Sequence, residues 1–393
     1  MPVTSADPNT RRRFVVIGRC ATAADRVAAG LRARRAAVVA LLPPLVAWAG
    51  ALALLCGAAV ATGHDPLHAS TWARFDSLAY EEIARHGYEV HRCTTGEPAR
   101  TWCGDAAWFP AYPMLMAAAA AAGVPLVAAG VVVSWLAAAG TLVLVWRWFL
   151  RCRRAAPLAC AAFAPGLVYL YAVFPLSLLT LSGTVFLRNL DRRRWLAGGA
   201  GAVAALAYPL GMALVPIVAV VSAVQRRRDR SLVAQAAVLG GPALVGGFLL
   251  VLEQWLQTGR WTAYADVAGS YGGLQDPVTS ITDLVRVLLH TSNAFAYALV
   301  PIWQFLLVTV LLAASVVAAC RRRAAAVIVA WCIAVWFVPL LQTQQSVWRS
   351  EAGLVLLAPL LALLPRRVIW IAAAALIVVA YGVAHEFFAG TLI

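Results

Sequence analysis

The sequence predicts an all-α protein that crosses a membrane several times. Of its 393 residues, 62% are hydrophobic and only 12% are charged, and the mean hydropathy is +0.79. Apolar runs such as residues 36–61 and 294–319 contain no charge, and each exceeds the about 20 residues that a helix needs to cross the hydrocarbon core. A helix satisfies its own backbone hydrogen bonds in lipid, so these runs are expected to be spanning helices.

The distribution of charge supports a membrane topology and argues against a nucleic-acid surface. The net charge of +15 comes from 32 basic residues, all of them arginine, against 17 acidic ones. The arginines stand in short clusters at the ends of apolar runs, at 32–35, 151–154, 192–194, 226–228, 321–323 and 366–367. This pattern is typical of loops that stay in the cytoplasm. No nucleic-acid partner is expected.

We expect a basic cytoplasmic tail at residues 1–35 and one transmembrane domain at residues 36–393. About nine to eleven membrane segments are predicted from the following apolar runs: 36–61, 106–122, 124–150, 155–171, 172–187, 195–224, 231–256, 294–319, 324–341, 350–364 and 368–389. If every run crossed once, the arginines after 150 and after 187 would lie outside, against the positive-inside rule.

Two adjustments keep every arginine cluster in the cytoplasm. The run at 106–122 either dips into the membrane or lies at its interface, and the run at 195–224 breaks near Pro209. Residues 62–105, 257–293 and 342–350 then lie outside. Partial and broken helices need protein or a water-filled cavity around their backbone, so both places are expected to border a site.

The first of these external stretches concentrates the polar chemistry. Residues 62–105 hold seven of the 17 acidic residues and four of the six histidines. In the second stretch, 257–293, glycines and Pro277 predict a flexible loop that covers a substrate.

Residues 71–88 predict an amphipathic helix on the outer membrane surface, with its apolar face formed by Phe75, Leu78, Ala79 and Ile83 and its end at Gly87. Asp76 is expected in the first turn, with Tyr80 one turn later on the same side. A simpler interpretation is that Asp76 only favours the helix dipole.

Two cysteines differ from the others. Cys93 and Cys103 lie ten residues apart in one polar stretch, and a disulfide is expected between them if that stretch faces an oxidising compartment. The cysteines inside apolar runs are interpreted as small core residues. No Cys/His spacing suggests a metal site, so neither a metal nor another cofactor is expected.

A second informative stretch opens the run at 106–122 and reads Trp108-Phe109-Pro110-Ala111-Tyr112-Pro113. Taken with Phe75-Asp76-Ser77 and with Ile83-Ala84 followed by Gly87-Tyr88, it resembles the first external loop of the PIG-V type mannosyltransferases, a family of the GT-C glycosyltransferase superfamily. In that family the loop typically reads Trp-Asp-Ser or similar, then Ile-Ala-x-x-Gly-Tyr, then Phe-Phe-Pro-x-Tyr-Pro.

The resemblance extends more weakly over residues 70–365. It includes Phe174-Pro175-x-Ser177, the segment 195–211 ending in Tyr208-Pro209-x-Gly211, and Trp348-Arg349-Ser350 followed by Leu357-Ala358-Pro359-Leu360. The chain departs from the family where an acidic Tyr-Ser-Glu type element and a Thr-Arg pair usually stand, because Leu181-Ser182-Gly183 and Ala207-Tyr208 stand there instead. Contacts made by that arginine are therefore in doubt, and the chain looks like a divergent bacterial member.

The resemblance implies a GT-C-like fold and a membrane glycosyltransferase, with mannose as the expected sugar. The donor would be a polyprenyl-phosphate sugar, and the acceptor a glycolipid or cell-envelope glycan at the external face of a bacterial plasma membrane. Asp76 would be the general base that deprotonates the acceptor hydroxyl, and a single displacement would invert the anomeric centre. No Asp-x-Asp, Gly-rich phosphate loop or nucleotide fingerprint occurs, which agrees with a lipid-carried donor.

Arg349 is the first candidate to bind the donor phosphate, because a guanidinium matches phosphate oxygens. Its alternative role is to anchor a helix end at the lipid headgroups. The further substrate-binding candidates are Arg74, Tyr80, His86, Trp108, Tyr112 and Gln345.

Some of these candidates, and other polar residues near them in the chain, have a plainer interpretation. His86 and His91 can assist proton transfer or simply be solvated, and surface polarity explains Gln342, Gln344 and Gln345 almost equally well. Glu81 and Glu82 are interpreted as a wetted helix face.

Two other classes of protein remain open. A secondary transporter or lipid flippase would suit the broken helices, although few ionisable residues are expected in mid-helix, with Glu253 near a helix end. A catalytically inactive relative with a scaffolding role is the other alternative.

Overall fold

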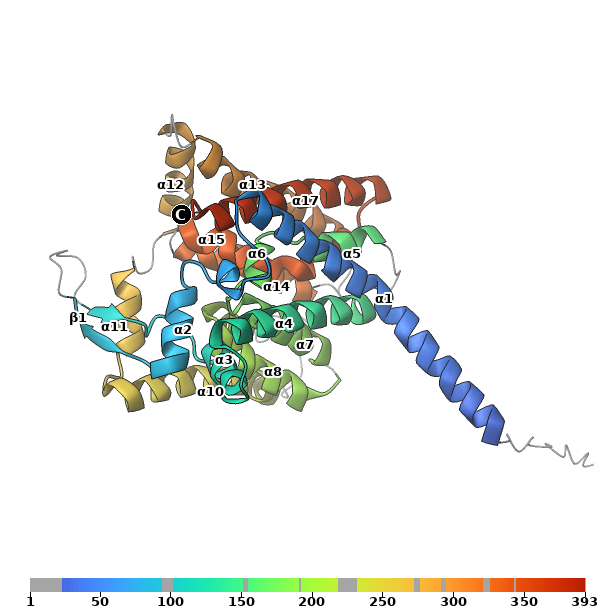
Figure 1. Ribbon diagram of the computed structural model, residues 1–393, viewed down its shortest axis with the longest axis horizontal. Coiled ribbons are helices and arrows are strands. Elements are labelled where there is room, and N and C mark those ends of the chain that lie inside the picture. The colour runs from blue at the N-terminus through green and yellow to red at the C-terminus, as the bar shows by residue number, and fades with distance from the viewer. Residues whose placement is uncertain are drawn as a thin grey trace, which may run out of the picture. The chain divides into compact units, whose positions relative to one another are not determined.

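The computed structural model describes residues 23–93, 102–150, 155–190, 192–217, 232–271, 276–290, 295–320, 326–342 and 344–392 (Figure 1). The described chain is helical except for one short two-stranded hairpin. It divides into two compact units, residues 1–43 and 44–393. The division falls at Pro43 and Pro44, inside helix α1 (Ala23–Ala61).

Among the described residues, five helices are long and apolar enough to cross a membrane, so the chain is an integral membrane protein. They are the Val38–Ala61 part of α1, α4 (Leu126–Trp148), the Ala237–Thr258 part of α10 (Leu232–Thr258), the Val300–Ala319 part of α13 (Phe295–Ala319) and α17 (Arg366–Ala389). Their outer faces leave Leu136, Val310 and Ile371 at least 65% exposed. Lipid covers such apolar side chains without the cost that water would impose.

Shorter elements fill the space between the long helices. They are η1 (Ala69–Trp72), α2 (Ser77–His86), α3 (Ala111–Ala121), α5 (Ala155–Ala162), α6 (Val168–Tyr171), α7 (Leu176–Asn189), α8 (Arg194–Ala207), η2 (Pro209–Ala213), α11 (Ala263–Ser270), α12 (Pro277–His290), α14 (Ala326–Phe337), η4 (Val338–Leu341), α15 (Gln344–Ser350), η5 (Glu351–Leu357) and α16 (Ala358–Leu361). Strands β1 (Val90–Arg92) and β2 (Trp102–Gly104) pair antiparallel, with His91 opposite Cys103.

Several predicted membrane runs are not single helices. The runs at 155–171 and 172–187 form α5, α6 and α7, and the run at 350–364 forms η5 and α16. Prolines explain the breaks, because a proline lacks the N–H of a helical bond and disfavours helix at the residue before it. The run at 195–224 breaks as expected, since α8 ends at Ala207 and Tyr208 is extended before Pro209.

The second predicted external stretch is not a flexible loop. Residues 263–270 and 277–290 are the helices α11 and α12. Pro277 occupies the first position of α12, and the Thr279 N–H donates to Asp276 Oδ1 over 2.9 Å. Proline at the first helical position and an acidic cap are signals of a helix start, so Pro277 begins a helix and does not belong to a loop as predicted.

The interior joins aromatic side chains from distant parts of the chain. Phe387 near the end of α17 packs against Phe75, Tyr169 and Phe174, with ring centroids 5.4 to 6.2 Å apart. Within the unit of residues 44–393, the hairpin, α2 and α11 lie at one end, on the left of Figure 1, and the C-terminus lies towards the same end. The polar side chains described next gather around this aromatic cluster.

Candidate functional site

The turn that carries Asp76 is hydrogen-bonded to the segment between α6 and α7. The Val173 N–H donates to the Trp72 carbonyl over 3.0 Å, and the Ser77 hydroxyl lies 3.1 Å from the Val173 carbonyl. Phe75 has a φ of +54°, a left-handed conformation that is unusual for a bulky residue. Such strain persists only where the surroundings hold the backbone, and here it stands directly before Asp76 at the start of α2.

The Asp76 carboxylate forms an ion pair with Arg349 on α15, 273 residues later in the chain. Asp76 precedes α2, and its side chain makes no capping bond to that helix. The position of the carboxylate is therefore set by the ion pair and not by an interaction with the helix dipole. The side chains are 28% and 18% exposed respectively. The pair is therefore largely desolvated but open to a ligand from one side.

Three tyrosines surround this pair. Tyr80, Tyr169 and Tyr208 interact electrostatically with both Asp76 and Arg349. Burial, followed by the negative charge of Asp76, raises the pKa of Tyr80 well above its ordinary value. Its hydroxyl therefore stays neutral and remains a hydrogen-bond donor beside the ion pair.

Behind Arg349 lies a buried polar pair that the sequence analysis missed. Glu351 is 1% exposed and Gln304 on α13 is 0% exposed, and Gln304 Nε2 donates to Glu351 Oε2 over 2.6 Å. Glu386 on α17, 6% exposed, is a second buried acid. The prediction of few ionisable residues within the apolar runs was therefore incomplete. Both acids stand among apolar residues in the sequence, and only the packing of the helices shows that they are buried.

The predicted substrate-binding residues divide into two groups. Arg74 and Tyr80 lie beside Asp76, and Arg74 Nε is buried without a hydrogen-bond partner among the described residues. The ring of Tyr112 packs 5.6 Å from that of Tyr80, but Tyr112 is fully buried and its hydroxyl donates to the Gly130 carbonyl over 2.8 Å. Tyr112 therefore supports Tyr80 and has no surface left for a substrate.

His86 and Trp108 lie away from the ion pair. His86 is exposed at the far end of α2, 3.7 Å from Glu82, and ten residues of helix separate it from Asp76 by roughly 15 Å. Trp108 packs against Tyr271 and its carbonyl accepts from the Tyr88 hydroxyl. The side chains of Gln344 and Gln345 lie outside the described part of the chain.

The buried side of α2 shares Ile83 with the predicted apolar face, which is expected to lie against the membrane surface. Ser77, Tyr80 and Ile83 are buried, whereas Leu78 is 65% exposed. The helix turns its tyrosine towards α3 and the ion pair, because the tight turn at Phe75 fixes its start. The spacing of apolar residues in the sequence does not indicate that turn.

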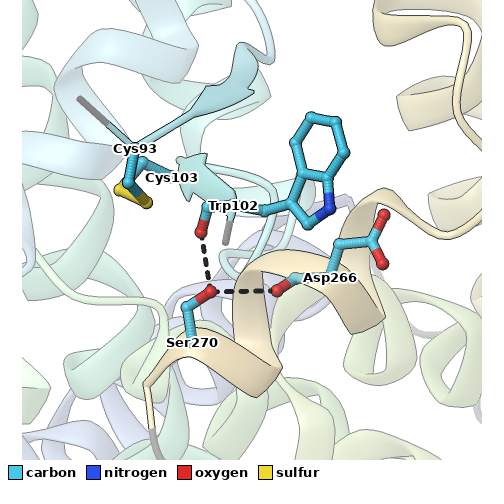
Figure 2. Close-up of a disulfide and its surroundings, with 5 residues drawn as sticks. All are labelled: Cys93, Trp102, Cys103, Asp266 and Ser270. Carbon is cyan, nitrogen blue, oxygen red and sulfur yellow. Dashed lines mark hydrogen bonds between the residues drawn. A yellow bond between two sulfur atoms is a disulfide. The ribbon is translucent and has the colours of Figure 1, made fainter. Parts of the chain in front are cut away.

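The hairpin and α11 form a second cluster, the hairpin lobe, defined by residues 88–93, 102–106 and 260–271. Cys93 and Cys103 form a disulfide with their Cα atoms 5.1 Å apart. The Ser270 hydroxyl donates to the Trp102 carbonyl over 2.7 Å, as Figure 2 shows. The Arg260 guanidinium, paired with Asp266, stacks 3.7 Å from the centroid of the Trp102 ring.

Within the hairpin lobe, Asp105 follows β2 and binds the backbone directly before β1. Burial raises the pKa of Asp105 to about 6, although its Oδ1 accepts the Glu89 N–H over 2.8 Å. This carboxyl group therefore changes its charge near neutral pH.

No protein-family model matches this chain, and no curated protein matches it. Within the residues that the structure describes, no group of three or more His, Cys, Asp or Glu side chains is arranged to hold a metal ion. The residues of the site therefore provide the grounds for a function.

Proposed function

We propose that the protein is a membrane glycosyltransferase that moves a sugar, with mannose as the expected one, from a polyprenyl-phosphate donor to a glycolipid or cell-envelope glycan. The observation that carries this proposal is the partly exposed ion pair of Asp76 and Arg349, which three tyrosines surround. A general base and a phosphate-binding cation are the two charges that the reaction requires. The GT-C-like character of the fold is part of the same proposal.

In the proposed reaction, a lone pair on the acceptor hydroxyl oxygen attacks the anomeric carbon while Asp76 takes the hydroxyl proton. The bond from that carbon to the phosphate oxygen breaks, and its electron pair leaves with the polyprenyl phosphate. Attack from the face opposite the leaving group inverts the anomeric centre. A positioned carboxylate of this kind contributes about 10²- to 10⁴-fold to the rate.

Arg349 acts on the leaving group in this scheme. In the resting site its Nη1 donates to Asp76 Oδ2, but a guanidinium has five N–H donors in a fixed fork. It can therefore hold the donor phosphate and still touch Asp76, which sets the base beside the anomeric carbon. A second cationic side chain, Arg74, has a donor to spare in the same region.

We also propose that the site faces the outside of a bacterial plasma membrane. The disulfide between Cys93 and Cys103 supports this side, because disulfides persist in oxidising compartments. The arginine clusters support a cytoplasmic location for the opposite ends of the helices.

The test is transfer of labelled sugar from polyprenyl-phosphate mannose into membrane lipids by the wild type and by an Asp76→Asn variant. Asn keeps the size of the side chain and removes the base, so turnover is expected to fall about 10²-fold or more. A Glu82→Gln variant, on the exposed side of α2, is the matched control. Wild-type transfer by Asp76→Asn would remove the assignment of Asp76.

A secondary transporter or flippase is the second candidate, and the buried Glu351 and Gln304 favour it. Ionisable residues enclosed within membrane bundles frequently belong to ion-coupled pathways. A transporter would move the labelled lipid across the vesicle membrane without forming a new glycosidic bond. Analysis of the product therefore separates the two functions.

A further inference from the structure

Gln304 connects three separate segments around the backbone that carries Arg349. Its Oε1 accepts the Gly166 N–H over 2.9 Å. Its Nε2 donates to the Trp348 carbonyl over 3.2 Å and to Glu351 Oε2 over 2.6 Å. One side chain from α13 therefore fixes the chain immediately before and two residues after Arg349.

Gly166 closes the same arrangement from the other side. Its φ is +63°, and a Cβ added there would lie 2.6 Å from the Trp348 carbonyl oxygen and 3.0 Å from the Ala352 nitrogen. Only glycine allows this close approach in a left-handed conformation. The turn between α5 and α6 therefore packs directly onto the junction of α15 and η5.

Glu351 is the one acid in this arrangement, and its surroundings favour the neutral form. Its Oε1 is buried and has no hydrogen-bond partner among the described residues, and none of the described salt bridges includes it. The nearest arginine in the chain, Arg349, is already paired with Asp76. A buried carboxylate with neither a cation nor full hydrogen bonding is costly, so the proton stays on the acid.

We propose that Gln304 and Glu351 are positioning residues that aim the Arg349 guanidinium at Asp76, with Glu351 acting as a neutral hydrogen-bond acceptor rather than as a base. Leaving Arg349 with a single carboxylate partner has a functional consequence. The guanidinium also hydrogen-bonds Tyr169, and its remaining N–H groups can bind a phosphate, which two ionised carboxylates would oppose. The activity readout of this inference depends on the proposed transferase function.

The test compares Glu351→Gln, Glu351→Ala and Gln304→Ala for sugar transfer and for binding of polyprenyl phosphate to the purified protein. Gln at position 351 still accepts from Gln304, so Glu351→Gln is expected to stay within a few-fold of the wild type. Both alanine variants are expected to lose transfer by about 100-fold, the effect of a reactive group misplaced by about 1 Å. Ser315→Ala, a buried serine on the same helix α13, is the control and should behave as the wild type.

A double-mutant cycle separates positioning from a merely structural role. Adding Glu351→Ala to an Arg349→Gln variant is expected to cause no further loss, because the arginine that Glu351 positions is already absent. A full additional loss would overturn the proposal, and so would a Glu351→Gln variant as impaired as Glu351→Ala. If the wild type neither binds polyprenyl phosphate nor transfers sugar, the transferase function itself fails. The neutral state of Glu351 can then still be tested by infrared spectroscopy, because a protonated Glu351 gives a carbonyl band that is absent in Glu351→Gln.

Discussion

At the scale of single residues, the ion pair depends on two features that no local pattern indicates. Phe75 adopts a left-handed φ of +54° just before Asp76, and Arg349 comes from a helix 273 residues later. The resemblance to one family points to both charged residues, to Asp76 through the first external loop and to Arg349 through the weaker segment at 348–350. Their direct contact could not be predicted, because it follows from the packing of α2, α6 and α15.

The geometry of Arg349 is expected to matter as much as its charge. An Arg349→Lys variant keeps the positive charge but loses the planar fork that can reach Asp76 and a phosphate together. We expect its affinity for polyprenyl phosphate to fall about tenfold or more, since a hydrogen bond to a charged group is worth about 1.5–3 kcal/mol. Titration of the purified variant measures this, and an unchanged affinity would mean that charge alone suffices.

Asp105 is expected to make the stability of the protein depend on pH. Its pKa is about 6 in the folded chain and about 3.9 when unfolded, so the folded state binds more protons between these values. The contribution of Asp105 to stability is therefore fully present below pH 4 and is lost as the pH rises through 6.

An Asp105→Asn variant removes this dependence and keeps the acceptor for the Glu89 N–H. At pH 7.5 it should be more stable than the wild type by about 1 kcal/mol, a value reduced for solvent screening, and at pH 4 the difference should vanish. Thermal unfolding at the two pH values measures it. A gain that is equal at both values would contradict the role of the Asp105 charge.

At the scale of elements, apolar composition predicts the long helices well and the short ones poorly. The helices α4, α13 and α17 match apolar runs closely because length and hydropathy suffice to specify a span. The helices α11 and α12 were missed because Gly269 and Pro277 were interpreted as loop residues, whereas they stand near the end of one helix and at the start of the next. Burial by the hairpin and by η4 stabilises them, and the sequence does not express these contacts.

The disulfide is expected to hold the hairpin lobe together. Replacing Cys93 and Cys103 with serine frees a loop of about ten residues, and a loop of this size contributes about 2–3 kcal/mol in the chain-entropy model. Hydrogen exchange of β1 and β2 should therefore speed up while the membrane helices stay protected. Cys320→Ser, at an exposed free cysteine, is the control; equal exchange in all three proteins would show that α11 alone holds the hairpin.

Gly166 is expected to tolerate no side chain. A Gly166→Ala variant places a Cβ against the Trp348 carbonyl at a positive φ, which should cost more than about 1 kcal/mol. Gly199→Ala, in the helix α8 with no atom within 4 Å of its added Cβ, should be neutral or stabilising. Thermal unfolding of both variants in detergent compares the two positions, and equal stabilities would refute the close packing of the turn onto α15.

At the scale of the whole molecule, the polar chemistry lies at one end of a helical membrane unit. The hairpin, α2 and α11 lie together at that end in Figure 1. The positive-inside rule predicted that residues 62–105 lie opposite the arginine clusters. Composition could predict a membrane protein, but the closed polar network of Gln304 and Glu351 requires the folded arrangement of α13, α15 and the turn at Gly166.

The sidedness of the site can be measured directly. In a variant that retains only Cys93 and Cys103, a Glu82→Cys substitution on α2 should react with an impermeant thiol reagent added to intact cells. An Arg322→Cys substitution in an arginine cluster should react only after the cells are opened. The reverse pattern would put Asp76 in the cytoplasm and exclude the proposed external reaction.

The most direct measurement of the central claim is the binding of polyprenyl phosphate to Asp76→Asn and Arg349→Gln variants, together with their transfer activity. If the two residues act as base and phosphate ligand, Asp76→Asn binds at least as tightly as the wild type, because the guanidinium loses only its internal carboxylate. Its transfer of sugar nevertheless falls about 10²-fold or more. Arg349→Gln then loses binding as well as transfer. Equal binding by all three proteins, with transfer intact, would contradict the account.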